Sequence, residues 1–253
     1  MSAPSSISAA APSAAPNRGV SSFTLKIVAI VGMTFNHACY IFYPYLPIEA
    51  LCVLFGFGGL TFPIMAFLLV EGYHHTSNIR RYASRLFAFA LISQIPYGLF
   101  LSHNLNVLFT LLIGLGLLYL YDNLESRAGF WLAAAALTTI SAMCDWGILG
   151  PLMILTMRAI SDRRQRVILP LLIPILGTGL PALSDFLGTI NLELLPPVLY
   201  PLLGCTATIP LLLAYNGSRG RPMKWLFYAY YPAHILVLGL AKGLLLGDWT
   251  LGA

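Results

Sequence analysis

Two histidines lie deep inside long apolar stretches of this 253-residue chain, His37 in the first stretch and His234 in the last. An ionisable side chain within an apolar segment is costly to bury without a task or a partner, so both residues are candidates for a functional site. The alternative is structural, because a neutral histidine can simply hydrogen-bond a neighbouring helix. For His234, which follows Pro232, we keep both alternatives open.

The spacing between Lys26 and His37 strengthens the case for His37. Eleven residues at about 100° each make three full turns plus ~20°, so the two side chains share one helix face. The rise between them is roughly 16 Å, about half the thickness of the hydrocarbon core. A ligand with an anionic head and a long thin arm would fit this geometry. Acyl-coenzyme A is such a ligand, with phosphates, a pantetheine arm and a thioester at its tip.

The polar turn at 71–81 (EGYHHTSNIRR) follows the second apolar stretch. It contains Glu71, Asn78, Arg80 and Arg81, together with two histidines. Arginine presents a fork of donors that suits phosphate, so this turn is a candidate docking site for a polyanion. Lipid headgroups would suit the same side chains.

The composition indicates a membrane protein. Hydrophobic residues make up 58% of the chain, charged residues 9%, and the mean hydropathy is +0.80. Residues 1–22 are rich in Ala, Ser and Pro, and we expect a disordered cytoplasmic arm there. Residues 23–253 are expected to form one transmembrane domain. The basic pI of 9.1 does not indicate nucleic-acid binding, because the charge is dispersed over the turns between apolar segments.

The apolar segments predict an all-α, polytopic transmembrane helix bundle with about nine spans, within a range of 8–11. They lie at 23–43, 50–70, 82–101, 105–121, 129–143, 147–160, 167–187, 196–215 and 225–246. The glycine run at 55–59 (FGFGG) predicts close helix packing. Threading the segments in order places all but Lys242 of the 14 Lys and Arg residues on one side. The positive-inside rule therefore predicts a multi-pass protein with a cytoplasmic N-terminus.

Several stretches of the sequence resemble the TraX family, and the resemblance extends over almost everything after residue 22. They are 24–37 (TLKIVAIVGMTFNH), 62–85 (FPIMAFLLVEGYHHTSNIRRYASR), 92–112 (ISQIPYGLFLSHNLNVLFTLL), 145–150 (DWGILG) and 230–236 (YYPAHIL). The resemblance implies a multi-pass acetylase of the bacterial inner membrane, of the kind that acetylates the N-terminus of conjugative pilin. Lys26 and His37 are separated by ten residues, and this spacing of a basic residue and a histidine also resembles the motif that opens the acyltransferase-three superfamily. Asn36 precedes the histidine where the resemblance leads us to expect Asp.

The resemblance and the residues together predict an acyl-CoA-dependent acyltransferase. The donor would be acetyl-CoA or another acyl-CoA, and the acceptor a pilin N-terminus or an envelope glycan or lipid. His37 would act as general base or carry the acyl group. The other expected roles are orientation of His37 or of the thioester (Asn36, His234), donor binding (Lys26, Arg80, Arg81, Arg85, Asn78, Glu71) and acceptor binding (Asp145, Trp146).

Two other classes of function stay open at this stage. The first is a carrier for a small polar solute, although no Asp or Glu lies deep in a span. The second is a non-catalytic assembly factor for pili or the envelope, in which His37 would be dispensable. Motifs for metal or nucleotide chemistry are missing from the sequence, so we expect no metal.

Overall fold

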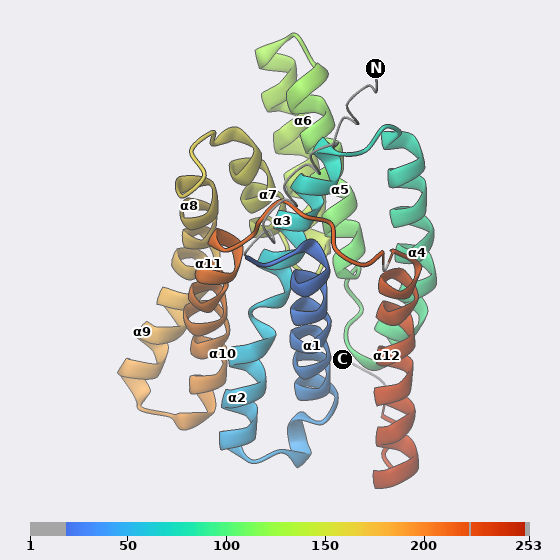
Figure 1. Cartoon of the computed structure of the whole chain (residues 1–253). Coiled ribbons are helices and arrows are strands. Elements are labelled where there is room, and N and C mark those ends of the chain that lie inside the picture. Colours follow the sequence, from blue (N-terminus) through green and yellow to red (C-terminus); the bar gives the residue numbers. More distant parts are fainter. Residues whose placement is uncertain (1–18, 223, 251–253) are drawn as a thin grey trace, which may run out of the picture.

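The computed structural model describes residues 19–222 and 224–250, and within these ranges the chain is helical without strands (Figure 1). The predicted all-α class is therefore confirmed for the described part. Most of the predicted N-terminal arm, including Arg18, lies outside the described residues. The α-helices are α1 (Ser22–Ile41), α2 (Ile48–Gly58), α3 (Thr61–His74), α4 (Ile79–Phe100), α5 (Val107–Asn123), α6 (Arg127–Ile140), α7 (Leu149–Ala159), α8 (Gln165–Pro174), α9 (Leu180–Thr189), α10 (Leu195–Leu199), α11 (Thr206–Leu213) and α12 (Lys224–Leu246).

Each predicted apolar segment coincides with one helix or with a run of consecutive helices. Three segments that we expected to be single helices are interrupted. The segment at 50–70 breaks into α2 and α3 at Gly59. The other two contain short π-helical turns, η3 (Ile175–Gly179) after Pro174 and η5 (Tyr200–Cys205) around Pro201. Proline lacks an N–H group and clashes with the preceding turn, which explains these irregularities.

Five helical stretches are long and apolar enough to cross a membrane by length and composition: 22–41, 48–74, 165–189, 192–213 and 225–246. Large apolar side chains also cover much of the outer surface, including Ile95, Leu132 and Leu244. Both features are typical of a helical membrane protein, in which the outer face of the bundle contacts lipid.

The helices start at polar caps that the sequence provides. The side chains of Ser21, Asn78 and Asn106 accept hydrogen bonds from backbone N–H groups in the first turns of α1, α4 and α5. Asn106 is fully buried and also donates to the carbonyl of Ala90 and to Gln94. Gln94 and Asn106 therefore fix the connection between α4 and α5.

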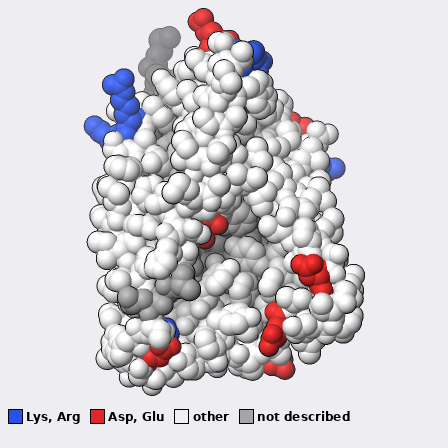
Figure 2. All heavy atoms as spheres, turned by 180° about the vertical axis from the view of Figure 1, so that it is seen from behind, with Lys and Arg blue, Asp and Glu red and all other residues white. Residues whose placement is uncertain are grey.

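Several helix ends meet at one end of the bundle. The start of α1 contacts the segment after α11, where Ser22 and Tyr215 hydrogen-bond through their hydroxyls. At the same end, Arg166 of α8 pairs with Glu71 of α3, and Arg158 of α7 pairs with Asp122 of α5. Figure 2 shows Lys and Arg atoms mainly toward the upper part of the molecule on the visible face. This end of the bundle carries the entrance to the cavity described below.

Candidate functional site

His37 and His234 contact each other across the interface between α1 and α12. Nδ1 of His37 lies 2.7 Å from Nε2 of His234, and the two rings are nearly parallel, with centroids 4.9 Å apart. The two residues are 197 positions apart in the chain. Both are buried, with 5% of His37 and 6% of His234 exposed. Two residues that the sequence singled out separately thus form one histidine pair.

A second hydrogen bond joins the same two helices one turn away. The hydroxyls of Thr34 and Tyr230 lie 2.5 Å apart, and the Tyr230 ring stacks on the His234 ring. His234 is fixed further by its own helix, since its Nδ1 lies 2.8 Å from the carbonyl oxygen of Tyr230. The pair is therefore held in place by several independent contacts.

A cavity of about 660 Å³ opens near the clustered helix ends and extends into the bundle. Toward these helix ends it is lined by polar and charged residues, and deeper in the bundle by Met33, Met65, Leu108 and Leu111. Tyr231 also lines it, and the Tyr231 ring contacts both His37 and His234 at centroid distances of 5.8 Å. His37 itself does not line the cavity. One aromatic side chain thus stands between the cavity and the histidine pair.

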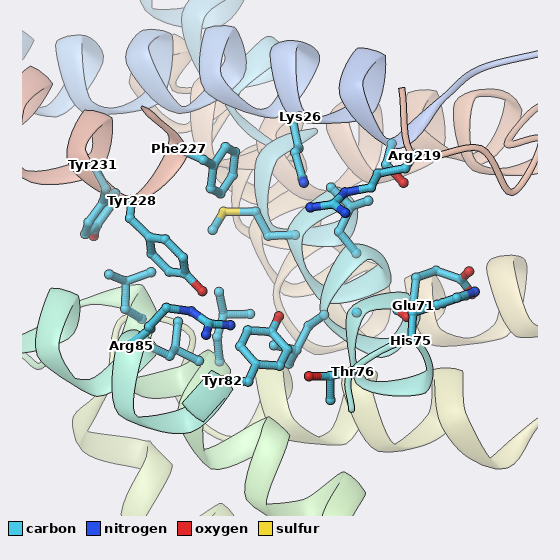
Figure 3. A pocket seen from close by; sticks show the side chains of 18 of the residues that line it. Lys26, Glu71, His75, Thr76, Tyr82, Arg85, Arg219, Phe227, Tyr228 and Tyr231 are labelled. Atoms are coloured by element: carbon cyan, nitrogen blue, oxygen red, sulfur yellow. The ribbon is translucent and has the colours of Figure 1, made fainter. Parts of the chain in front are cut away.

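Lys26, Arg85 and Arg219 place three positive charges in the cavity. Figure 3 shows Lys26 and Arg219 directed into it from one side, with Arg85 and Tyr82 across from them. Lys26 and Arg219 repel each other electrostatically. Among the described residues none of the three cations forms an ion pair. Nε of Arg85 is buried there without a hydrogen-bond partner, which is unusual for a guanidinium.

The structure separates the predicted donor-binding residues into two groups. Lys26, Arg85 and Glu71 line the cavity, although Glu71 is paired with Arg166. The others do not line it: the arginines 80 and 81 are exposed, and residue 78 is the N-cap of α4. His75, which also lines the cavity, belongs to the polar turn at 71–81. The lining residues that were not predicted as site residues include Tyr82, Arg219, Tyr228 and Tyr231. Because these come from separate segments of the chain, no local motif connects them.

Asn36 and the predicted acceptor residues lie outside the cavity. The side-chain oxygen of Asn36 is buried without a hydrogen-bond partner, and Asn36 packs against Gly58. Asp145 accepts a hydrogen bond from the hydroxyl of Tyr97 at 2.9 Å. Trp146 stacks on Phe62 with ring centroids 4.0 Å apart. Among Asn36, Asp145, Trp146 and His234, it is His234 that hydrogen-bonds His37.

The described residues contain no group of three or more His, Cys, Asp or Glu side chains that could hold a metal ion. The described site places a buried imidazole pair beside a cationic cavity. Such a cavity is suited to an anion, and a buried imidazole can accept a proton or attack a carbonyl.

Comparison with known proteins identifies the family. Residues 21–242 match the family model described as TraX protein. The chain is also similar to the "Probable fimbrial assembly protein FimC, serogroup H1" of Dichelobacter nodosus, with 28% identity over 243 residues that cover 89% of this chain and 97% of that protein. No solved structure matches the chain. Since the family model extends over nearly the whole described chain, including Lys26, His37 and His234, the protein belongs to the TraX family.

Proposed function

We propose that this protein is a membrane acyltransferase that uses acetyl-CoA or another acyl-CoA as donor. The acceptor is an amine or hydroxyl group on a pilin or on another envelope component. The observation that carries the proposal is the cavity, whose three cations form no ion pair with any described residue and which reaches a tyrosine in contact with the His37–His234 pair.

The charge distribution of the cavity supports an acyl-CoA donor. Three cations without acidic partners are unfavourable unless an anion neutralises them, and phosphates interact well with Lys and Arg. In this proposal Lys26, Arg85 and Arg219 bind the phosphates of the donor. The apolar inner part then surrounds the pantetheine arm. Movement of the Tyr231 side chain would connect this part of the cavity with His37.

The proposed reaction uses His37 as general base. Its imidazole takes the proton from the acceptor N–H or O–H group while the acceptor attacks the thioester carbonyl. The carbon–sulfur bond then breaks, and the leaving thiolate receives the proton from the imidazolium. Alternatively, His37 attacks the thioester itself, forms an acyl-imidazole and passes the acyl group to the acceptor.

Asp145 and Trp146 remain the proposed acceptor-side residues. The Asp145 carboxylate acts electrostatically on the hydroxyls of Tyr40, Tyr97 and Tyr231, and Tyr231 contacts His37. An acceptor at Asp145 would thus approach the histidine pair from outside the donor cavity.

In the proposed topology the chain crosses a bacterial inner membrane nine times with its N-terminus inside. The end of the bundle that carries the cavity entrance then faces the cytoplasm, where acyl-CoA is made. This arrangement requires α4–α7 to cross the membrane in addition to the five stretches described above.

The name of the D. nodosus relative favours a second candidate, in which the protein is a pilus assembly factor without catalytic activity. The two candidates differ in what they require of His37. An assembly factor would tolerate its replacement by another buried polar residue, whereas an acyltransferase would not.

The test compares His37→Gln with His103→Gln, because His103 is exposed in the α4–α5 connection. Purified protein in detergent is given acetyl-CoA, and release of the CoA thiol and acetyl-CoA binding are measured. We expect thiol release to fall about 10²–10⁴-fold in His37→Gln, the usual contribution of a positioned general base. His103→Gln should match the wild type. Equal turnover by all three proteins, or no binding of acetyl-CoA by the wild type, would contradict the proposal.

A further inference from the structure

The proton positions in the histidine pair follow from one backbone carbonyl. Nδ1 of His234 lies 2.8 Å from the carbonyl oxygen of Tyr230. A carbonyl oxygen can only accept a hydrogen bond, so Nδ1 of His234 carries the hydrogen. In a neutral imidazole the other nitrogen then has a lone pair and no hydrogen. Nε2 of His234 is therefore an acceptor.

This assignment determines the tautomer of His37. Its Nδ1 lies 2.7 Å from Nε2 of His234, and two acceptors at that distance would repel each other. Nδ1 of His37 must therefore donate, which leaves the lone pair of His37 on Nε2. Among the described residues none hydrogen-bonds Nε2 of His37.

The surrounding contacts keep His234 in this orientation. Its ring meets the edge of the His37 ring through the short nitrogen–nitrogen contact, and the Tyr230 ring stacks on it at a centroid distance of 4.9 Å. The Thr34 hydroxyl donates to the carbonyl of Ile30, so it accepts from the hydroxyl of Tyr230. Each of these two hydrogen bonds between α1 and α12 therefore has a defined donor: His37 donates to His234, and Tyr230 donates to Thr34.

We infer that His234 is a positioning residue that keeps the proton of His37 on Nδ1 and leaves Nε2 as its reactive nitrogen. The effect on catalysis rests on the proposed function. In that reaction Nε2 takes the acceptor's proton and later returns it to the thiolate. While the proton is on Nε2, the Nδ1–H group of the imidazolium stays hydrogen-bonded to the neutral His234, which stabilises the charge.

The first experiment measures the tautomers without any assay of activity. The full chain is labelled with ¹⁵N-histidine in detergent or nanodiscs, and signals of the five histidines are assigned by single substitutions. We expect Nδ1–H tautomers for His37 and His234 in the wild type. His234→Gln should keep the His37 tautomer because its amide oxygen accepts the same hydrogen bond. His234→Leu should shift His37 toward the Nε2–H tautomer.

The matched control is Tyr230→Phe, which removes the hydroxyl bonded to Thr34 but keeps the aromatic ring and the backbone carbonyl. It should leave the His37 tautomer unchanged even if the protein becomes less stable. An Nε2–H tautomer of His37 in the wild type, or a tautomer that His234→Leu does not alter, would overturn the inference.

The second experiment measures thiol release from acetyl-CoA. We expect kcat to fall about 10²-fold in His234→Leu, toward the lower end of what a positioned base contributes, with KM for acetyl-CoA unchanged. His234→Gln should recover most of the lost rate. Wild-type kcat in a folded His234→Leu protein would refute the positioning role while leaving the acyltransferase proposal intact. If the wild type shows the expected tautomers but does not turn over acetyl-CoA, the acyltransferase proposal is refuted and the proton assignment stands.

Discussion

Arg219 and Arg221 are both exposed in the loop between α11 and α12, but of the two only Arg219 lines the cavity. The pair offers a test of the donor site at the scale of single residues. Replacing Arg219 with Ala should raise the KM for acetyl-CoA about 10-fold, equivalent to one charge-assisted hydrogen bond of ~1.5 kcal/mol. The value of kcat should change little, because the substitution is remote from His37. Steady-state kinetics of thiol release would measure both parameters.

Arg221→Ala is the matched control, since it removes the same charge from the same loop. Its KM should equal that of the wild type. If both variants raised KM equally, the effect would be due to overall charge, and the specific role of Arg219 in the cavity would be wrong.

At the scale of elements, the junction between α2 and α3 packs directly on the backbone of η5. A Cβ atom on Gly59 would overlap the carbonyl oxygen of Tyr200, and one on Gly204 would overlap the backbone of Gly59. The predicted close packing of the glycine run at 55–59 is thereby confirmed. Neither backbone can move away easily, because Gly59 joins the packed helices α2 and α3 and Gly204 lies within η5. Only glycine therefore permits this approach.

We expect Gly59→Ala to lower the free energy of unfolding by about 1–3 kcal/mol, the typical cost of overpacking. Gly116→Ala in α5 is the control, because its Cβ would meet nothing within 4 Å. Alanine should be neutral there, or more stable by about 0.5–1 kcal/mol through its helix propensity. Thermal unfolding in detergent would compare the two. Similar Tm values for both variants would contradict the close approach of the two backbones.

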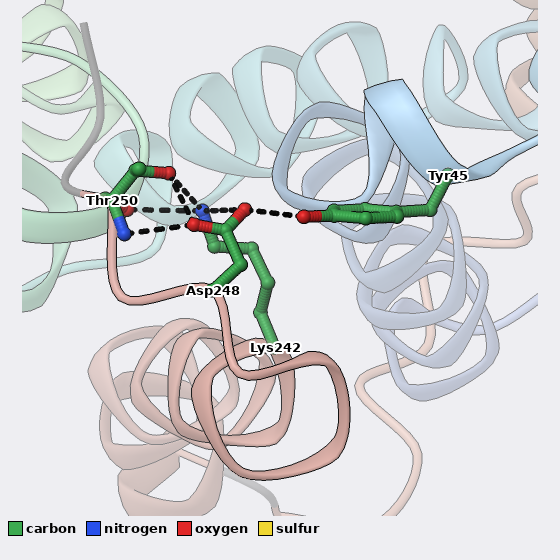
Figure 4. Close-up of polar contacts among 4 residues, drawn as sticks. All are labelled: Tyr45, Lys242, Asp248 and Thr250. Carbon is green, nitrogen blue, oxygen red and sulfur yellow. Dashed lines mark hydrogen bonds and ion pairs between the residues drawn. The ribbon is translucent and has the colours of Figure 1, made fainter.

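A second element-scale contact joins the turn after α1 to the segment after α12 (Figure 4). Asp248 accepts hydrogen bonds from the hydroxyl of Tyr45 at 2.7 Å and from the backbone and side chain of Thr250. Lys242 lies 3.3 Å from the same carboxylate. Hydrogen bonds from Thr250 and Tyr45 hold the pKa of Asp248 well below its usual range.

This contact predicts a loss of stability in acid. Because the folded-state pKa of Asp248 is depressed, its contribution is fully present above the ordinary Asp pKa of about 4 and declines as the pH falls below it. The Tm difference between the wild type and Asp248→Asn should therefore shrink between pH 5 and pH 2, two values chosen to lie roughly on either side of that pKa. Differential scanning fluorimetry over this range would measure it. A constant difference would show that ionisation of Asp248 does not stabilise the contact.

At the scale of the whole molecule, the proposed topology places the α3–α4 turn and the α4–α5 turn on opposite sides of the membrane. A membrane-impermeant maleimide should label His103→Cys in intact cells, in which the reagent reaches only the outer face of the membrane. Ser77→Cys should be labelled only after the membrane is permeabilised. The wild type supplies the background, which includes any labelling of the partly exposed Cys52, whereas Cys39, Cys144 and Cys205 are buried. Labelling of Ser77→Cys in intact cells would contradict a cytoplasmic cavity entrance.

The sequence by itself determined the helical segments and the face shared by Lys26 and His37. Apolar runs and helix periodicity are local properties of the chain, so they can be read without tertiary contacts. The single helices expected at 50–70, 167–187 and 196–215 were interrupted in the structure, since glycine and proline act on the backbone in ways that hydropathy does not register.

Only the tertiary structure decided which of the predicted residues lie together. It paired His37 with His234, placed Tyr231 between them and the cavity, and brought in Arg219 from a distant loop. It also left Arg80 and Arg81 outside the cavity although they are neighbours of Tyr82 in the sequence. The physical reason is that helix rotation and packing set which side chains face one another. These depend on contacts between segments far apart in the chain, whereas spacing within one helix does not.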